Sequence, residues 1–415
     1  MTATPLRIVR IANFVTPVSG GLRTALRHLG AGYLAAGHEP VLVIPGPHRR
    51  DELTDQGRVV TLPGRVLPAS GGYRVLTDRR AVERELTALA PDRLEVSDRT
   101  TLRWTGRWAG ANGVRSAMVS HENATGLLRT RGLPEPLARS LADRLNSRTA
   151  AAYDQIICTT AWAAAEFRRL GVRHLVEAPL GVDLEQLQPW RHDATVRARY
   201  AEPAQPLLVL CSRLSPEKRP GLALDALAEL RRRGQDAVLV VAGTGPLRER
   251  LEARARRDRL PVRFLGHLAE RAELAALLAS ADATVAPGPI ETFGLAALEA
   301  LACGTPVAVS RSSALSAIVG PAGAVAEDSG TGFADAVEDL LARPEAERRA
   351  AARAPAERYG RAAAVAGVRC VHEQPYPGPA GVAVPPAGAV PTVHASLAGG
   401  AVPSDDGVER TGSPR

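Results

Sequence analysis

Glu291 and Glu299, two glutamates eight positions apart, flank a short apolar run in the last third of the chain. The Pro-Gly-Pro segment just before Glu291 disfavours a helix, whereas residues 293–302 are strong helix formers and Gly304 can end the helix. We therefore expect Glu291 on a loop, Thr292 as the N-cap and Glu299 two turns into the helix. At about 1.5 Å per residue, the two carboxylates would lie roughly 12 Å apart along the axis. That is about the span from the sugar to the ribose of a nucleotide-sugar.

The start of this predicted helix also suits an anion. The first N–H groups of a helix have no partner inside it, and the positive end of the helix dipole adds to their attraction for a phosphate. We expect the N–H groups of Phe293, Gly294 and Leu295 to face a diphosphate between the two carboxylates. The plain alternative is a loop–helix junction with solvated glutamates. Because Glu is common, the spacing needs support from the rest of the chain.

Two basic residues follow a buried strand predicted at residues 207–211. They are Arg213 and Lys218, and Lys218 is the single lysine among the 52 Lys and Arg residues of the chain. Two cations at the carboxyl edge of a parallel sheet can neutralise a diphosphate while a glycosidic bond breaks. They could also be ordinary surface charges, but their coincidence with the glutamate pair favours a shared site.

Glycines follow two of the predicted strands. Gly20 and Gly21 separate a strand at residues 6–12 from a helix at residues 22–36, and Gly243 follows a strand at 237–242, where it would face a nucleotide. Without a side chain, a glycine lets the backbone approach a phosphate or a sugar closely. The first loop lacks the third glycine of G-x-G-x-x-G and the acidic residue that follows it, so it is not a dinucleotide fingerprint. A plain tight turn is the alternative.

A histidine, His121, stands directly after a strand predicted at residues 116–120. Open α/β sheets bind their ligands at the carboxyl ends of the strands. We therefore predict that His121 lies in the binding site. The alternative is an exposed strand end.

The elements that must position these residues alternate between strand and helix. Short apolar runs followed by helical patterns recur in both halves of the chain, which is the βαβ rhythm of doubly wound parallel sheets. Polar, proline-punctuated residues between the halves indicate a linker. The last residues are rich in Pro and Gly and cannot bury enough surface to order themselves. The predicted parts are a first domain at 1–183, a linker at 184–206, a second domain at 207–370 and a disordered tail at 371–415.

Length and composition narrow the class of protein. A chain of 415 residues with 45% apolar residues can fill two hydrophobic cores. No uninterrupted apolar stretch reaches the roughly 18 residues of a membrane span. The N-terminus reads as a strand rather than as a signal peptide. Four cysteines without C-x-x-C or metal-ligand spacing favour the reducing cytoplasm.

The net charge of +8 suits anionic ligands, such as nucleotide-sugars, or an anionic lipid surface. Nucleic acid is the poorer candidate, because the arginines are spread over many predicted helices and aromatics are only 4% of the residues. One basic stretch is amphipathic, with Leu137, Leu141 and Leu145 repeating every four residues among arginines. We expect these leucines to face the core, with contact to anionic lipid as the alternative.

Together, these motifs resemble the retaining glycosyltransferases of family 4, which have the GT-B fold. Glu291 and Glu299 match that family's E-x7-E signature, and residues 207–220 are similar to its strand-Arg-loop-Lys motif. The likeness runs from about residue 6 to residue 345. It implies an α/β fold with two Rossmann-like, doubly wound parallel-sheet domains that face an inter-domain cleft. Residues 346–370, where the family's closing helix would cross back onto the first domain, are mostly alanine and arginine with few hydrophobic anchors.

The resemblance also implies how the donor's diphosphate is held. Arg213 and Lys218 would bind it. Backbone N–H groups at Phe293, Gly294 and Leu295 would assist them.

The remaining candidates would contact the sugar and the ribose. In enzymes of this family, the residue matching Glu291 hydrogen-bonds sugar hydroxyls and the residue matching Glu299 binds the ribose. From the first domain, Gly20 and Gly21 would approach the donor, and His121 would lie near the sugar.

The implied chemistry is departure of the nucleotide from the face that the acceptor attacks, with retention of configuration. The leaving phosphate, stabilised by the two cations, would itself help to deprotonate the incoming hydroxyl. Domain closure would exclude water, because an exposed sugar cation would be hydrolysed. The scheme needs no metal and no cofactor beyond the nucleotide-sugar. Consistently, no D-x-D and no histidine pair with ligand spacing occurs before the tail.

Overall likeness indicates the donor and the acceptor. The run from Ser19 to Thr24 and the second-domain motif look most like actinobacterial mannosyltransferases that use GDP-mannose and act on inositol lipids or related glycolipids. The enzyme would then be cytoplasmic and peripheral at the inner face of the membrane. A glucosyl or N-acetylglucosaminyl transferase that uses a UDP-sugar, for instance onto inositol phosphate, is the near alternative.

Two further alternatives belong to other classes of protein. A GT-B-fold sugar-nucleotide epimerase would convert the donor without an acceptor, but it needs paired acid/base carboxylates. A non-catalytic nucleotide-binding module would bind NAD, which the missing dinucleotide fingerprint disfavours. The sequence sets no oligomeric state.

Overall fold

The computed structural model describes residues 4–15, 20–68, 70 and 72–374. Residues Met1–Gly381 form one compact unit, and the second unit, Val382–Arg415, lies outside the described residues. The predicted disordered tail therefore lies outside them too, apart from its first four positions.

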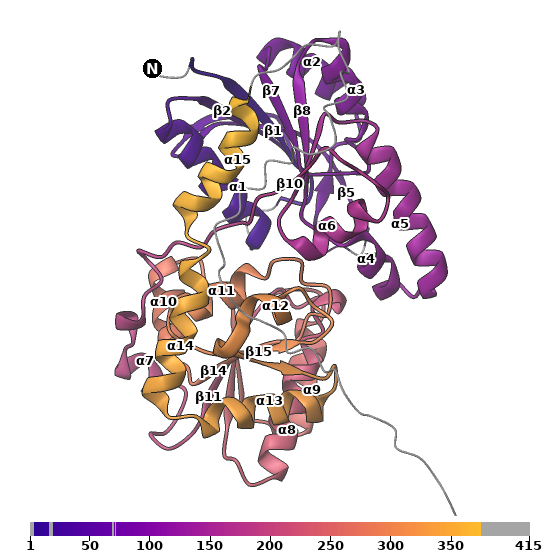
Figure 1. The fold of residues 1–415 in the computed structure, drawn as a ribbon. Helices are drawn as coiled ribbons and strands as arrows, with labels where there is room; N and C mark the ends of the chain where they lie inside the picture. Colours follow the sequence, from indigo (N-terminus) through magenta and orange to yellow (C-terminus); the bar gives the residue numbers. More distant parts are fainter. Residues whose placement is uncertain (1–3, 16–19, 69, 71, 375–415) are drawn as a thin grey trace, which may run out of the picture. The chain divides into compact units, whose positions relative to one another are not determined.

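The first domain is built on a sheet that has eight strands within the described residues (Figure 1). Its strands are β1 (Arg7–Ile11), β2 (Glu39–Gly46), β3 (Arg50–Thr54), β4 (Gly57–Pro63), β7 (Arg93–Val96), β8 (Arg115–Ser120), β9 (Gln155–Cys158) and β10 (Leu175–Glu177). Their order is β10-β9-β8-β7-β1-β2-β4-β3, and among the described strands of this sheet only β3 and β4 pair antiparallel. A separate antiparallel pair is formed by β5 (Arg65–Val66) and β6 (Arg74–Val75).

Helices connect the strands of this sheet. They are α1 (Gly21–Ala35), α2 (Arg79–Leu89), α3 (Trp104–Ala111), α4 (Ala124–Thr130), α5 (Glu135–Ala150) and α6 (Ala161–Arg168). Three of these helices begin at side-chain caps. Asp78, Asn123 and Thr160 each accept a hydrogen bond from the N–H three positions later, which satisfies a donor that the helix leaves free.

The second domain is built on a sheet of six strands within the described residues, all parallel. They are β11 (Leu207–Cys211), β12 (Val238–Ala242), β13 (Val262–Gly266), β14 (Ala283–Ala286), β15 (Val307–Ser310) and β16 (Gly323–Ala326). Their order is β13-β12-β11-β14-β15-β16. Strand β12 is buried at every position, as its continuous Val-Leu-Val-Val-Ala run predicts for a parallel strand covered on both faces.

Short and long helices surround this second sheet. The linker region holds the 3-10 turn η1 (Pro189–Arg191) and helix α7 (Ala194–Ala198). The domain itself carries η2 (Pro216–Lys218), α8 (Gly221–Arg232), α9 (Arg248–Arg257), α10 (Arg271–Ser280), α11 (Leu295–Ala302), α12 (Leu315–Val319), η3 (Gly320–Ala322), α13 (Gly330–Ala342) and α14 (Glu345–Glu357). The fold class predicted from the sequence, two α/β domains with parallel sheets, is confirmed.

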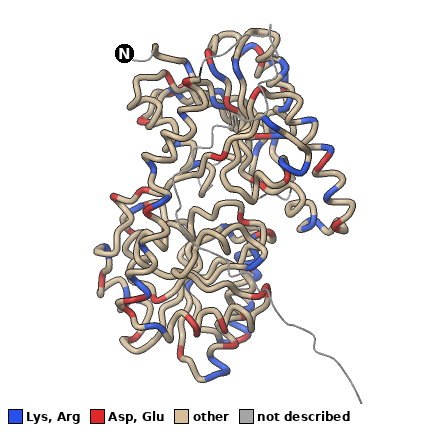
Figure 2. The backbone as a smooth tube through the Cα atoms, in the orientation of Figure 1, with Lys and Arg blue, Asp and Glu red and all other residues tan. Residues whose placement is uncertain are grey.

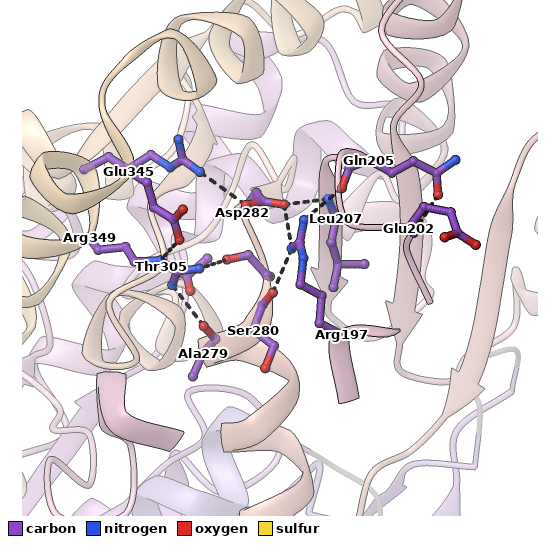
Figure 3. Close-up of polar contacts among 12 residues, drawn as sticks. Arg197, Glu202, Gln205, Leu207, Ala279, Ser280, Asp282, Thr305, Glu345 and Arg349 are labelled. Atoms are coloured by element: carbon purple, nitrogen blue, oxygen red, sulfur yellow. Dashed lines mark hydrogen bonds and ion pairs between the residues drawn. The ribbon is translucent and has the colours of Figure 1, made fainter. Parts of the chain in front are cut away.

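A buried aspartate, Asp282, ties the linker to the second sheet at the amino ends of its strands (Figure 3). Its Oδ2 accepts hydrogen bonds from Arg197 Nη1 of α7 at 2.8 Å and from the backbone N–H of Leu207 at 2.8 Å. Its Oδ1 lies 3.2 Å from Arg348 Nη2 of α14. Arg349, on the same helix, donates to the carbonyl groups of residues 279 and 281. One carboxylate thus joins α7, β11 and α14, away from the carboxyl edge of the sheet.

Helix α15 (Arg361–Glu373) packs on α1 of the first domain, side by side with it in Figure 1. Val365, Val368 and Val371 join a core cluster that includes Ile8 of β1. The sequence assignment of residues 361–370 to the second domain, and of Val371 to the tail, differs from this arrangement. The valines lie every three residues on one helical face, which supplies the apolar anchor that the Ala- and Arg-rich composition hid. We therefore propose that α15 belongs to the first domain.

Helix α5 differs from expectation in the face that it buries. Leu137 is 51% exposed and Leu141 is 38% exposed. The core side carries small and polar residues instead, namely Ala138, Ala142, Asn146, Thr149 and Ala150. The prediction that the leucines at 137 and 141 face the core is therefore wrong, because the small and polar residues form the buried face of α5 instead. Outside this helix, Figure 2 shows basic and acidic residues interspersed along the described chain.

None of the helices in the described ranges is both long enough and apolar enough to cross a bilayer.

Candidate active site

The loop after β11 carries both predicted cations. Arg213 follows the strand by two residues, and Lys218 ends the 3-10 turn η2. Backbone bonds from Ser212 N–H to the Ala242 carbonyl, and from Leu214 N–H to the Thr244 carbonyl, tie this loop to the loop after β12. The cations are therefore fixed at the carboxyl edge of the sheet, where parallel α/β sheets bind ligands.

Gly243 lies in the loop after β12, directly against the cation-bearing loop. A Cβ built on Gly243 would lie 1.8 Å from the carbonyl oxygen of Ser212, so only glycine fits there. The structure thus brings Gly243 beside Arg213.

Glu291 and Lys218 form an ion pair, with Lys218 Nζ 2.5 Å from Glu291 Oε1. Glu291 stands in the loop between β14 and α11, as the Pro-Gly-Pro segment predicts. The pair forms because β14 is the direct neighbour of β11 in the sheet, so the loops that follow the two strands meet at the same edge. Both side chains keep part of their surface open, 27% for Lys218 and 20% for Glu291, and so could reach a ligand.

Helix α11 begins later than predicted. Its N-cap is Gly294, in the left-handed conformation with φ 71°, and its first residue is Leu295. Thr292 is buried and, within the described residues, its hydroxyl has no hydrogen-bond partner, so the predicted cap at Thr292 is wrong. The reason is the sharp turn at Gly294, which separates Phe293 from the helix. Glu299 consequently lies little more than one turn into the helix instead of two.

The N-terminus of α11 still presents free N–H groups. The N–H groups of Ala297 and Leu298 both donate to the Gly294 carbonyl. Those of Leu295 and Ala296 precede this ladder and have no partner inside the helix. Of the three N–H groups predicted to face a diphosphate, only that of Leu295 belongs to the helix, and the diphosphate site stays a prediction.

Glu299 is held by a residue that the sequence reasoning missed. Arg271 Nη2, on the first residue of α10, donates to Glu299 Oε1 at 2.9 Å. A signal was present in the sequence, because a cation in the first turn of a helix opposes the helix dipole and needs a reason to be there.

Arg213 also has partners that the sequence did not indicate. Its guanidinium pairs with Glu217 four residues on, and it stacks on the ring of Tyr73 with 4.8 Å from Cζ to the ring centroid. Burial opposes ionisation of Glu217, but the Ser215 hydroxyl and the charge of Arg213 outweigh it, so the pKa of Glu217 is lowered. Glu217 therefore already neutralises part of the charge of Arg213.

His121 follows β8 at the carboxyl edge of the first sheet, as predicted. Its Nε2 lies 3.0 Å from the Ser97 hydroxyl at the end of β7. Burial lowers the pKa of His121 to about 4; Glu95 opposes this and Arg99 adds to it. The ring is neutral at physiological pH, so it can form hydrogen bonds but does not supply a positive charge.

Gly20 and Gly21 stand at the start of α1, with Gly20 as its N-cap. A Cβ built on Gly21 would lie 3.3 Å from Leu295 Cδ1. The structure thus places Gly21 beside the first residue of α11. Residues 16–19 of the same loop, also part of the predicted glycine-rich segment, lie outside the described residues.

Three of the candidate residues, Lys218, Glu291 and Glu299, lie in two ion pairs of the second domain. Lys218 pairs with Glu291 where β11 and β14 end. Arg271 pairs with Glu299 near the end of β11, because Glu299 adds to the rise in the pKa of the Cys211 thiol, which burial raises to about 12. Cations, acids and free N–H groups at one sheet edge can bind a molecule that carries both a diphosphate and several hydroxyls.

Two family models match this chain. Residues 20–181 match the glycosyl transferase 4-like domain, and residues 194–357 match the glycosyl transferases group 1. Among solved structures, sucrose-phosphate synthase from Thermosynechococcus elongatus superposes with a TM-score of 0.72 at 21% identity, covering 89% of this chain and 98% of that one. The Anabaena protein HepE in complex with UDP and glucose superposes with a TM-score of 0.68 at 14% identity, covering 88% and 99%. These likenesses show the fold, that of a GT-B glycosyltransferase.

The curated relatives narrow this class. The GDP-mannose-dependent alpha-(1-6)-phosphatidylinositol dimannoside mannosyltransferase of Mycobacterium tuberculosis is 50% identical over 356 residues, which cover 85% of this chain and 92% of the relative. A phosphatidylinositol monomannoside mannosyltransferase of Mycolicibacterium smegmatis is 32% identical over 268 residues, covering 61% and 66%. The chain belongs to family 4 of the glycosyltransferases, among its actinobacterial mannosyltransferases.

Proposed function

We propose that this enzyme transfers mannose from GDP-mannose to a hydroxyl of a phosphatidylinositol mannoside, with retention of configuration and without a catalytic metal. The 50% identity to a mannosyltransferase with this donor and acceptor class supports the substrates. The observation that carries the site is the Lys218–Glu291 pair at the carboxyl edge of the second sheet. A cation for the leaving diphosphate and an acid for the sugar hydroxyls then stand side by side.

In this proposal the diphosphate is bound by Lys218, Arg213 and the N–H groups at the start of α11. Positive charge there stabilises the departing nucleotide, which is where negative charge develops. Glu291 holds sugar hydroxyls while Lys218 turns toward the phosphate, so the 2.5 Å pair opens on binding. Glu299 takes the ribose hydroxyls.

On the first-domain side, His121 donates or accepts a hydrogen bond at the sugar as a neutral ring, and Gly20 and Gly21 allow close approach of the backbone. Gly243 does the same on the nucleotide side.

A nucleotide screen tests the donor. Isothermal titration calorimetry with GDP, UDP, ADP and dTDP, in the presence of EDTA, should show GDP binding most tightly. Preferential binding of UDP would instead favour the UDP-sugar transferase. Conversion of the nucleotide-sugar in the absence of any acceptor would favour the epimerase.

We also propose that α5 contacts the membrane that holds the acceptor. Leu137 and Leu141 are exposed, and Arg144 and Arg148 follow them on the same helical face, three and seven residues after Leu141. Apolar residues beside arginines on an exposed face suit the boundary of an anionic bilayer. This is the alternative interpretation of the amphipathic helix, now favoured because the leucines do not face the core.

Vesicle flotation tests the membrane contact. The double variant Leu137→Ser/Leu141→Ser should lose binding to vesicles of phosphatidylinositol and phosphatidylcholine. Leu53→Ser, at a leucine that is 87% exposed on the edge strand β3, is the matched control and should keep it. Equal binding by both variants would remove α5 from the contact surface.

A further inference from the structure

Glu299 is the more buried member of the Arg271–Glu299 pair. The side chain of Glu299 is 9% exposed, and that of Arg271 is 34% exposed. A carboxylate at this depth loses most of its hydration, so it needs a charged partner or hydrogen-bond donors from the protein. Arg271 supplies that partner from a different helix, α10, which packs on α11.

The geometry leaves one carboxylate oxygen available. Arg271 Nη2 engages Oε1 of Glu299, and among the described residues no donor contacts Oε2. A charge-assisted hydrogen bond from a guanidinium fixes the plane of the carboxylate, so the direction of the second oxygen is fixed as well. The neighbouring Cys211 is a neutral thiol, because burial raises its pKa to about 12, and does not compete for the guanidinium.

We propose that Arg271 is a positioning residue for ribose recognition: it holds the Glu299 carboxylate so that Oε2 accepts a hydrogen bond from a ribose hydroxyl of the donor nucleotide. This rests on the proposed function, since Glu299 must face the ribose. Arg271 acts through Glu299 and makes no contact with the nucleotide. Without the guanidinium, the carboxylate is free to turn, and the ribose hydroxyls lose their oriented acceptor.

If Arg271 acts through Glu299, its removal should affect nucleotides with and without ribose hydroxyls differently. A general structural role would affect both alike. A site that hydrogen-bonds a hydroxyl rejects the analogue without it, because the acceptor is then left unpaired. Removing Arg271 should therefore weaken binding of GDP but leave binding of 2′,3′-dideoxy-GDP almost unchanged. A direct contact of Arg271 with the base or the diphosphate would weaken both nucleotides equally.

The test compares two nucleotides in five proteins, measured by isothermal titration calorimetry. We expect wild type to prefer GDP over 2′,3′-dideoxy-GDP by about tenfold or more. In Glu299→Gln and Arg271→Gln this ratio should fall to near one, and Arg271→Lys should restore part of it. The matched control is Arg254→Gln, which removes an arginine paired with Asp225 between α8 and α9 and should keep the wild-type ratio.

Two results would overturn the inference. One is a wild-type ratio in Arg271→Gln, or in Glu299→Gln if the Arg271 variant fails to fold by circular dichroism. The other is a wild-type enzyme that binds both nucleotides equally, because Glu299 would then not read the ribose. A wild type that binds neither GDP nor its analogue would instead contradict the proposed donor, which separates the two failures.

Discussion

At the scale of single residues, the proposed site depends on two ion pairs, Lys218 with Glu291 and Arg271 with Glu299, that join separate elements. The single lysine and the glutamate spacing pointed to Lys218, Glu291 and Glu299, and the sheet order explains why Lys218 and Glu291 meet. Arg271 was not predicted because its partner, Glu299, lies 28 positions further on in the sequence, and only the packing of helices α10 and α11 brings the two side chains together. Pairing between distant helices depends on packing that no local pattern contains.

His121 gives a prediction about pH. Its folded pKa is about 4, lowered mainly by burial, against about 6.5 for an unfolded histidine. Between these values the unfolded chain binds the extra proton, so the contribution of His121 is present above pH 6.5 and is lost as the pH falls toward 4. Urea unfolding at pH 7 and pH 4.5 should therefore show a larger loss of stability for wild type than for His121→Gln. Equal losses would mean that the ring is not buried in its neutral form.

At the scale of elements, buried strands were predicted closely, whereas exposed strands and the ends and faces of several helices were not. The continuous apolar run of β11 identified it directly. The edge strand β3 reads Arg-Asp-Glu-Leu-Thr and is exposed throughout, so no apolar alternation marks it. The start of α11 was misplaced because the helix formers begin before Gly294, whose left-handed turn delays the helix.

Gly294 gives the prediction at this scale. An added Cβ would lie 2.6 Å from Leu315 Cδ2, at a φ of 71° that disfavours every residue with a side chain. Gly294→Ala should lower the free energy of unfolding by about 1–3 kcal/mol and weaken GDP binding, because the N-terminus of α11 must shift.

The control is Gly110→Ala in α3, where an added Cβ meets nothing within 4 Å. This change should raise stability by about 0.5–1 kcal/mol. Similar effects at both glycines, measured by urea unfolding, would show that the turn at residue 294 is not required.

At the scale of the molecule, the last described helix completes the first domain. After β16 and α13 the chain runs through α14 and crosses at Gly360, which bridges to Val182. Helix α15 then packs on α1 so closely that a Cβ on Gly32 would lie 2.4 Å from Val365. At its far end His372 Nε2 lies 3.1 Å from the buried Glu95. This packing supports our proposal that α15 belongs to the first domain.

Removal of α15 tests that statement. A chain ending at Gly360 loses the three buried valines, and the first domain should lose about 4 kcal/mol or more relative to a chain ending at Gln374. Differential scanning calorimetry should show the transition of the first domain moving to a lower temperature, while the transition of the second domain stays unchanged. If both chains unfold alike, the contacts of α15 contribute no stability.

The central claim is that Lys218 and Glu291 together act on a mannosyl nucleotide. It is tested most directly by transfer of labelled mannose from GDP-mannose to phosphatidylinositol dimannoside in vesicles containing EDTA, with the product anomer assigned by NMR. Wild type should form an α-mannoside, and Lys218→Ala, with an unchanged melting temperature, should lose at least about 100-fold in turnover. A β-linked product, no transfer by wild type, or unreduced turnover in Lys218→Ala would contradict the account.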